Sequence, residues 1–185
     1  MRFIFDQKKT TQAAAQVIFL HGGRLNYMKL IKLLYLADRE SLIDRGMPIT
    51  GDAMVSMPHG PVLSNTLNLI NEGEHGGSRY WYESVTGPSS WEVGLVHKNP
   101  ATDLLSRYEV DLLEKIVGKF RAFSQWDLRD FTHDLPEWGD PDGSSYPIEP
   151  KEILEAAGAT DEEIRRYTIE AEELWRMKHL AENWP

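Results

Sequence analysis

Cysteine is absent from the 185-residue sequence, which excludes disulfide bonds and thiolate chemistry and suits a reducing compartment. Long hydrophobic runs are absent as well, since none approaches the ~20 residues that a membrane-spanning helix needs. The first residues are too short for a signal peptide, so we expect a cytoplasmic protein without a membrane partner. Hydrophobic residues still make up 41% of the chain, which is enough for the core of one domain.

The common signatures of catalysis and metal binding are missing too. The chain contains no Gly-x-Ser-x-Gly elbow, no phosphate-binding P-loop, no Gly-x-Gly-x-x-Gly and no His-Glu-x-x-His pair. Without cysteine, a structural zinc site is not expected. We therefore predict no catalytic residue, no metal and no cofactor.

One alternative stays open, which is a small metal-dependent or hydrolytic enzyme. It would require His59 and His133 to meet in space, with Asp38 and Asp52 completing the site. The plainer interpretation is that both histidines are hydrogen-bonded scaffold residues. Metal analysis of the purified protein would separate the two.

Positive charge is scarce, because 20 Lys and Arg stand against 29 Asp and Glu, for a net charge of −9. Residues 1–60 hold eight basic and five acidic side chains, a net of +3, whereas residues 61–185 hold twelve and twenty-four, a net of −12. A nucleic-acid-binding protein would show a basic face, so nucleic acid is not an expected partner of this chain alone. The acidic surface suits a basic protein partner, and it also serves solubility.

Residues 27–45 predict one long helix, because they are good helix formers without Gly or Pro. Asn26 is the expected N-cap, and Gly46-Met47-Pro48 ends the helix. One side is apolar and comprises Tyr27, Leu30, Ile31, Leu34, Ala37 and Leu42. The opposite side is expected to be solvated and comprises Lys29, Lys32, Leu36, Arg39 and Glu40.

Asp38 falls in the middle of the apolar side of this helix. A buried carboxylate without partners costs several kcal/mol, so Asp38 should meet hydrogen-bond donors from another segment. The expected donors are backbone N–H groups, Arg45 or a histidine.

The remaining pattern predicts a mainly α (α+β) fold: a single compact helical domain around the long hydrophobic helix, with one β-hairpin and a C-terminal helix. Capping boxes begin helices at Ser106 with Glu109 and at Thr160 with Glu163. The expected hairpin joins strands 79–85 and 91–97 through the turn at 86–90. Further helices are predicted over residues 9–21, from Gly60-Pro61 to residue 71, and over 106–122, 125–134, 150–157 and 161–181.

Two positions allow a functional interpretation beside a structural one. Gly60-Pro61 is typical of a helix start, and His59 would then stand beside free N–H groups where an acidic group can dock. The plain helix start is favoured. Trp138 is typical of a packed loop anchor, although its polar neighbours leave a partner-facing role open.

Four sequence blocks together resemble the Panacea domain family of antitoxins, which includes SocA-like proteins and phage-associated GepA proteins. The first is Lys29-Leu-Ile-Lys-Leu-Leu-Tyr-Leu-Ala-Asp-Arg, and the second is Gly46-x-Pro-Ile-Thr-Gly-Asp. The third is His59-Gly-Pro-Val, and the fourth is Phe131-Thr-His with Trp138. Each block alone is weak, and the combination is fairly specific.

The resemblance covers about residues 10–160, so we expect an antitoxin domain over 1–160 and a C-terminal helix over 161–185 packed on the same domain. It implies neutralisation of a cognate protein toxin by direct binding. In SocA-like members the domain instead delivers the toxin to a AAA+ protease. We expect no extra DNA-binding domain of the kind that some relatives carry, and a homodimer is left open.

The matched motif residues are the candidate partner-binding positions. Asp38 and His133 among them could form a buried polar pair. The full set is Lys29, Lys32, Tyr35, Asp38, Asp52, His59, Gly60, Pro61, His133 and Trp138.

Overall fold

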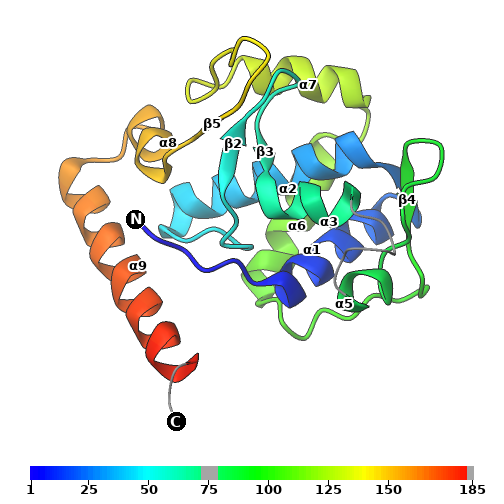
Figure 1. Cartoon of the computed structure of the whole chain (residues 1–185), viewed down its shortest axis with the longest axis horizontal. Coiled ribbons are helices and arrows are strands. Elements are labelled where there is room, and N and C mark those ends of the chain that lie inside the picture. The colour runs from blue at the N-terminus through cyan, green and yellow to red at the C-terminus, as the bar shows by residue number, and fades with distance from the viewer. Residues whose placement is uncertain (72–78, 183–185) are drawn as a thin grey trace.

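A computed structural model describes residues 1–71 and 79–182 of the chain (Figure 1). Within these residues the fold is mainly α with a small amount of β structure, which confirms the predicted fold class. The helices are α1 (Gln7–Leu20), α2 (Tyr27–Arg45), α3 (Ser64–Asn71), α5 (Arg79–Tyr82), α6 (Arg107–Lys119), α7 (Gln125–His133), α8 (Pro150–Ala156) and α9 (Asp161–Glu182). The strands are β1 (Arg24–Asn26), β2 (Met54–Ser56), β3 (Val62–Leu63), β4 (Glu92–Gly94) and β5 (Tyr146–Pro147).

Helix α2 has the bounds that its sequence predicts. The Asn26 side chain accepts hydrogen bonds from the N–H groups of Met28 and Lys29, which have no partner inside the helix. Gly46 ends the helix with a φ of +70°, a left-handed conformation that favours glycine. The ring of Tyr167 in α9 lies where a β-carbon on Gly46 would stand. The same glycine therefore serves the end of the helix and a long-range contact.

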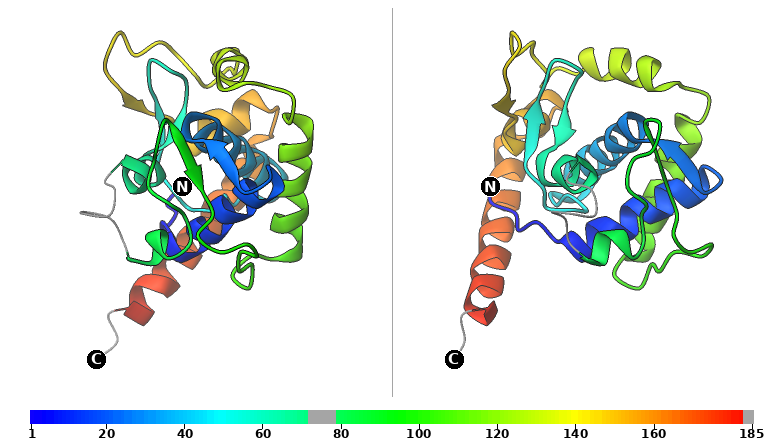
Figure 2. Two further views of the ribbon diagram at one scale, coloured as in Figure 1. Left: turned by 90° about the vertical axis from the view of Figure 1, so that its right-hand side faces the viewer. Right: turned by 45° about the vertical axis from the view of Figure 1, so that its right-hand side comes forward.

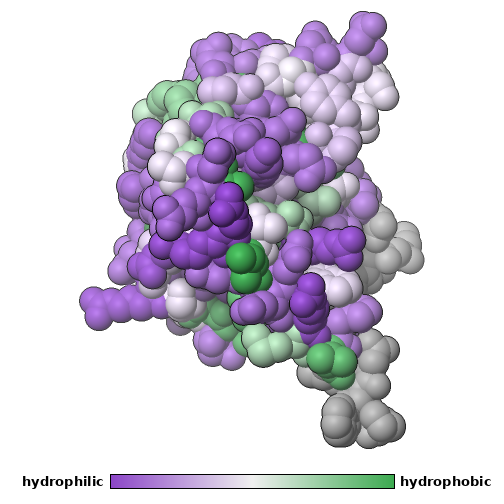
Figure 3. All heavy atoms as spheres, turned by 90° about the vertical axis from the view of Figure 1, so that its left-hand side faces the viewer, coloured by the Kyte–Doolittle hydropathy of each residue, from purple (hydrophilic) through white to green (hydrophobic). Residues whose placement is uncertain are grey.

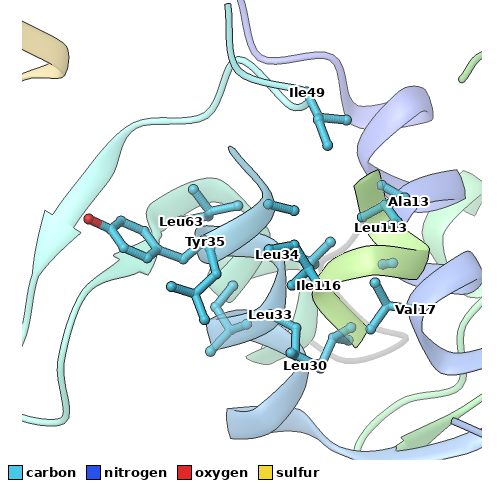
Figure 4. Packing of buried hydrophobic residues seen from close by; sticks show 14 of the residues in the cluster. Ala13, Val17, Leu30, Leu33, Leu34, Tyr35, Ile49, Leu63, Leu113 and Ile116 are labelled. Atoms are coloured by element: carbon cyan, nitrogen blue, oxygen red, sulfur yellow. The ribbon is translucent and has the colours of Figure 1, made fainter. Parts of the chain in front are cut away.

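The core forms where α2 packs against α1 and α6 (Figure 4). Leu30, Leu33 and Leu34 are at most 1% exposed, and they meet Val17 of α1 and Leu113 of α6 in the same cluster. Burial of one such leucine contributes about 1.5–3 kcal/mol.

The other side of α2 is covered as well. Helices α7 and α8 and strand β3 contact it (Figures 1 and 2). Leu36, on the side expected to be solvated, is 5% exposed. Helix α2 is therefore a central helix without a solvated side along its first three turns.

The predicted β-hairpin is only partly present. The chain does turn back at residues 86–90, because Val85 and Leu95 form an isolated antiparallel bridge. Residues 79–82, however, form helix α5, and strand β4 pairs with β1 instead. Burial of Trp81, which is fully inaccessible, outweighs the strand preference of this aromatic segment.

The predicted helix start at Gly60-Pro61 is wrong by three to four residues. Strands β2 and β3 pair as an antiparallel hairpin, and α3 begins only at Ser64. Gly60 has a φ of +87°, which a right-handed helix does not allow. Strand β2 also pairs with β5, which brings the segment after α7 back beside the hairpin.

The last helix, α9, lies along the side of the molecule that also carries α8 (Figure 1). Ala171 is 1% exposed, and the guanidinium of Arg2 lies 5.4 Å from the ring centre of Trp175. Seen from this side, the surface is mostly hydrophilic with separated hydrophobic side chains (Figure 3). The exposed apolar residues of α9 are Ile169, Leu174, Met177 and Leu180. Among the described helices, none has the length and apolar character needed to cross a membrane.

Candidate functional site

Asp38 is fully buried and is satisfied by the loop between α2 and β2. One carboxylate oxygen accepts hydrogen bonds from the N–H groups of Ile49 at 3.0 Å and Thr50 at 3.1 Å, and the other accepts from the Thr50 hydroxyl. Burial raises the pKa of Asp38, and the hydrogen bonds from Thr50 and Ile49 oppose that rise. The predicted backbone donors are confirmed. The pairing with His133 that the sequence left open is not among the recorded contacts of Asp38, whose carboxylate accepts from the loop donors.

Asp52 holds the start of α3. Its two oxygens accept from the backbone N–H and side-chain amide of Asn65 at 3.0 and 2.8 Å, and from the N–H and hydroxyl of Thr66 at 2.8 and 2.7 Å. These N–H groups belong to the first helical turn and lack intrahelical partners. The hydroxyl of Thr50 accepts from the N–H of Asp52 at 3.0 Å, so the two carboxylates belong to one network. Both acids are used by the fold itself.

Lys29 is 8% exposed, which corrects the expectation that it is solvated. Its ammonium donates to the backbone oxygens of Arg121 at 3.1 Å and Phe123 at 2.5 Å, in the turn that follows α6. Burial lowers its pKa, with Arg121 adding to the effect. Lys29 therefore joins α2 to the connection between α6 and α7.

Tyr35 and Arg39 meet one carboxylate from the segment after α7. The Tyr35 hydroxyl donates to Glu137 Oε1 at 2.9 Å, and Arg39 donates to the same oxygen at 2.6 Å and to Oε2 at 3.2 Å. The Glu137 side chain is fully buried. Burial raises the pKa of the Tyr35 phenol, and the charge of Glu137 adds to the rise.

Sequence reasoning did not identify Glu137. The only signal was its position beside Trp138 in a segment that was interpreted as loop.

His133 and Trp138 form a stacked pair, with ring centres 3.9 Å apart and planes 6° from parallel. The indole N–H of Trp138 donates to the backbone oxygen of Met57 at 3.1 Å, so the packed-anchor interpretation fits this residue. The Nε2 atom of His133 is buried without a hydrogen-bond partner among the described residues. Burial and the nearby charge of Lys32 lower the pKa of His133.

His59 lies on the β2–β3 turn and is exposed. No contact that the structure records joins His59 to His133. In residues 1–71 and 79–182, no three His, Asp or Glu side chains are grouped as a metal site would require. The two carboxylates that the enzyme alternative needs lie in the separate network around Thr50.

A pocket of about 410 Å³ opens between the first half of α2 and the β2–β3 turn. Lys32 lies in its wall and is 1% exposed, so the expectation of a solvated Lys32 is wrong. Its ammonium donates to the backbone oxygen of Pro61 at 2.7 Å, and burial lowers its pKa to about 7. Within the described residues, no carboxylate forms an ion pair with it. The other lining residues that matter here are Met28, Ile31, Met57, His59, Gly60, Val62 and Leu67.

Gly60, which lines this pocket, is packed tightly against side chains of α2 and α7. A β-carbon at this position would stand 2.8 Å from the Lys32 ammonium and 2.7 Å from the Thr132 hydroxyl. It would also stand 3.2 Å from the ring of His133. The structure thus brings together Lys32, His133 and the turn at 59–61, and it places Asp38 and Asp52 elsewhere.

A sequence model of the family described as "Antitoxin SocA-like, Panacea domain" matches residues 30–139. The matched range begins in α2 and ends just after Trp138, so it contains Lys32, the turn at 59–61 and all three buried carboxylates discussed above. Neither the curated proteins nor the solved structures include a significant match to the chain.

Proposed function

Because the chain belongs to the SocA-like antitoxin family with the Panacea domain, we propose that it is the antitoxin of a type II toxin–antitoxin pair. It neutralises a cognate protein toxin by direct binding. The family match over residues 30–139 is the observation that carries this proposal.

The arrangement of the buried acids supports a binding role. Asp38, Asp52 and Glu137 accept their hydrogen bonds from groups of the chain itself. A general acid or base must reach a proton of a substrate, and these carboxylates instead hold loops and helices in place. What the fold offers to another protein is a preformed surface.

The distribution of charge along the chain supports a basic protein partner. The chain carries a net charge of −9, and residues 61–185 account for −12 against +3 in residues 1–60. Complementary charge accelerates the encounter of two proteins and selects against wrong partners.

The test is co-expression with the product of the neighbouring reading frame. Growth should stop when that product is expressed alone and recover with this chain, and the two proteins should co-purify at a fixed ratio. Light scattering on the purified complex would also show whether the chain is a monomer or a dimer. The proposal is contradicted if growth is not rescued and the two proteins do not co-purify.

The toxin level in the rescued cells separates two forms of the proposal. A toxin that persists at its usual level is sequestered. A toxin that disappears, and returns in a strain without the relevant AAA+ protease, is delivered for degradation. The resemblance to SocA-like members makes this second form a specific outcome to measure.

A further inference from the structure

Lys32 is a buried cation without a counter-charge in the described part of the chain. Its ammonium has three N–H donors, and Pro61 accepts the single hydrogen bond that the structure records for it. Other buried or half-buried cations have better partners: Lys9 pairs with Glu109 at 2.6 Å, and Arg39 pairs with Glu137 at 2.6 Å. An uncompensated charge in this position weakens the fold, because water is removed and little replaces it.

Lys32 lies in the wall of a pocket of about 410 Å³, a size that admits a small ligand or a side chain. The surrounding wall is mostly apolar and includes Met28, Met57 and Leu67, with polar groups from His59, Asn71 and Ser144. Methionine side chains are flexible and adapt to different occupants. Gly60 lies close to the ammonium, since a β-carbon there would stand 2.8 Å from it.

We propose that this pocket, the Lys32 pocket, receives the carboxylate of an aspartate or glutamate side chain that an apolar segment of the toxin carries. The carboxylate supplies the missing counter-charge, and the apolar wall buries the carbon atoms around it. This proposal rests on the proposed function, because it assigns part of the toxin-binding surface. A basic toxin would be drawn by the overall charge of the chain, and one of its few acidic residues would then be selected by the pocket.

The first arm of the test uses 4-methylpentanoate and its neutral isostere 4-methylpentanamide on the ¹⁵N-labelled full chain. The carboxylate should produce saturable amide shifts at Ile31, Gly60 and Val62, and the amide should bind at least tenfold more weakly. Lys32→Met should lose this preference. The matched control Lys115→Met removes an exposed lysine that pairs with Glu40 on the surface, and it should keep the preference.

Three results of this arm would overturn the proposal. They are equal binding of the two probes, an unchanged preference in Lys32→Met, and the absence of saturable shifts with either probe. Thermal unfolding verifies that Lys32→Met is folded. If it is not, Lys32→Gln takes its place, because glutamine keeps N–H donors without carrying charge.

The second arm measures binding of the neighbouring gene product to the same variants. Lys32→Met should bind at least tenfold more weakly than the parent chain and than Lys115→Met. Removal of the last residues of the toxin should leave binding unchanged. A loss of binding on this truncation would assign the toxin's terminal carboxylate to the pocket and overturn the side-chain assignment. If the parent chain neutralises the toxin and Lys32→Met binds it equally well, the pocket proposal fails while the proposed function stands. If the probes bind and no toxin is neutralised, the proposed function fails instead.

Discussion

Asp38 and Lys32 are both buried on α2, yet the surrounding chain supplies them with different numbers of hydrogen-bond partners. Asp38 receives three hydrogen bonds from Ile49 and Thr50 and lies in a network that includes Asp52. Lys32 has one acceptor, the Pro61 carbonyl, and borders a pocket. A buried charge that its own fold satisfies is part of the architecture. A buried charge that its own fold leaves largely unsatisfied is available to a ligand, and it costs stability until the ligand arrives.

Lys29 sharpens this comparison, because it is the same residue type one helical turn away. It is 8% exposed, against 1% for Lys32, and its ammonium has two carbonyl acceptors after α6. Residue type is therefore not what distinguishes Lys32. Lys32 is more deeply buried than Lys29 and has fewer recorded hydrogen-bond partners.

The largest effect is expected for Asp38→Ala, which leaves two backbone N–H groups and the Thr50 hydroxyl without an acceptor. We expect a loss of about 3–5 kcal/mol in the free energy of unfolding, because each unsatisfied buried donor costs about 1–3 kcal/mol and some relaxation is expected. Urea denaturation measures it. A change below about 1 kcal/mol would show that these donors find other partners, and the contrast with Lys32 would then lose its basis.

Gly60→Ala should cost about 2–4 kcal/mol. A left-handed conformation costs a non-glycine residue about 1–2 kcal/mol, and the added methyl group would press on Lys32 and Thr132. Gly158→Ala is the matched control, because its φ is +84° and nothing lies within 4 Å of the added carbon. Equal losses in the two variants would mean that the space beside the ammonium is not tightly bounded.

Lys32→Met should raise the free energy of unfolding at pH 7 by about 1–3 kcal/mol, because a buried ammonium is replaced by an apolar side chain of similar length. The gain should shrink toward pH 10. The pKa of Lys32 is about 7 in the folded chain and 10.5 in an unfolded one. Between these values the unfolded chain binds more protons, so the parent chain becomes more stable as pH rises.

The difference between parent and Lys32→Met, measured by urea denaturation from pH 6 to pH 10, isolates this group from all others. A difference that does not change with pH would contradict the burial of the ammonium. Destabilisation at pH 7 would mean that the hydrogen bond to Pro61 matters more than the missing counter-charge.

The smallest effect is expected for Lys29→Met, a loss of about 1–2 kcal/mol. Two carbonyl groups after α6 lose a charged donor, and each such hydrogen bond contributes about 1 kcal/mol or somewhat more. Lys29→Met should therefore lower the free energy of unfolding, whereas Lys32→Met should raise it. The two lysine variants measured side by side at pH 7 test the comparison directly, and a shared sign would refute it.

The sequence predicted α2 correctly to the residue, as well as the capping boxes of Ser106 with Glu109 and of Thr160 with Glu163. Capping and helix propensity act between residues at most four positions apart, so a contiguous stretch contains the whole cause. Asp38 was also interpreted correctly, because its position on an apolar face required donors whatever their source.

The predictions that were wrong concern which faces of α2 are covered and which strands pair across long stretches of sequence. Lys29 and Lys32 were expected in solvent because a helix with one apolar stripe was assumed, whereas α2 is covered on both sides. Strand β4 was expected to pair with its neighbour in sequence and pairs instead with β1, about 70 residues away. The contribution of Glu137 became visible only when the segment after α7 was seen against Arg39.

The sequence by itself determined the mainly α fold class, the limits of the central helix and the resemblance to the antitoxin family. All three follow from residue types and from short spacings along the chain. Only the tertiary structure decided which side chains of α2 are buried, which of them are satisfied, and where a pocket remains. Those answers depend on segments far from α2 in the sequence, at Pro61, Arg121 and Glu137, whose positions follow from packing the whole chain.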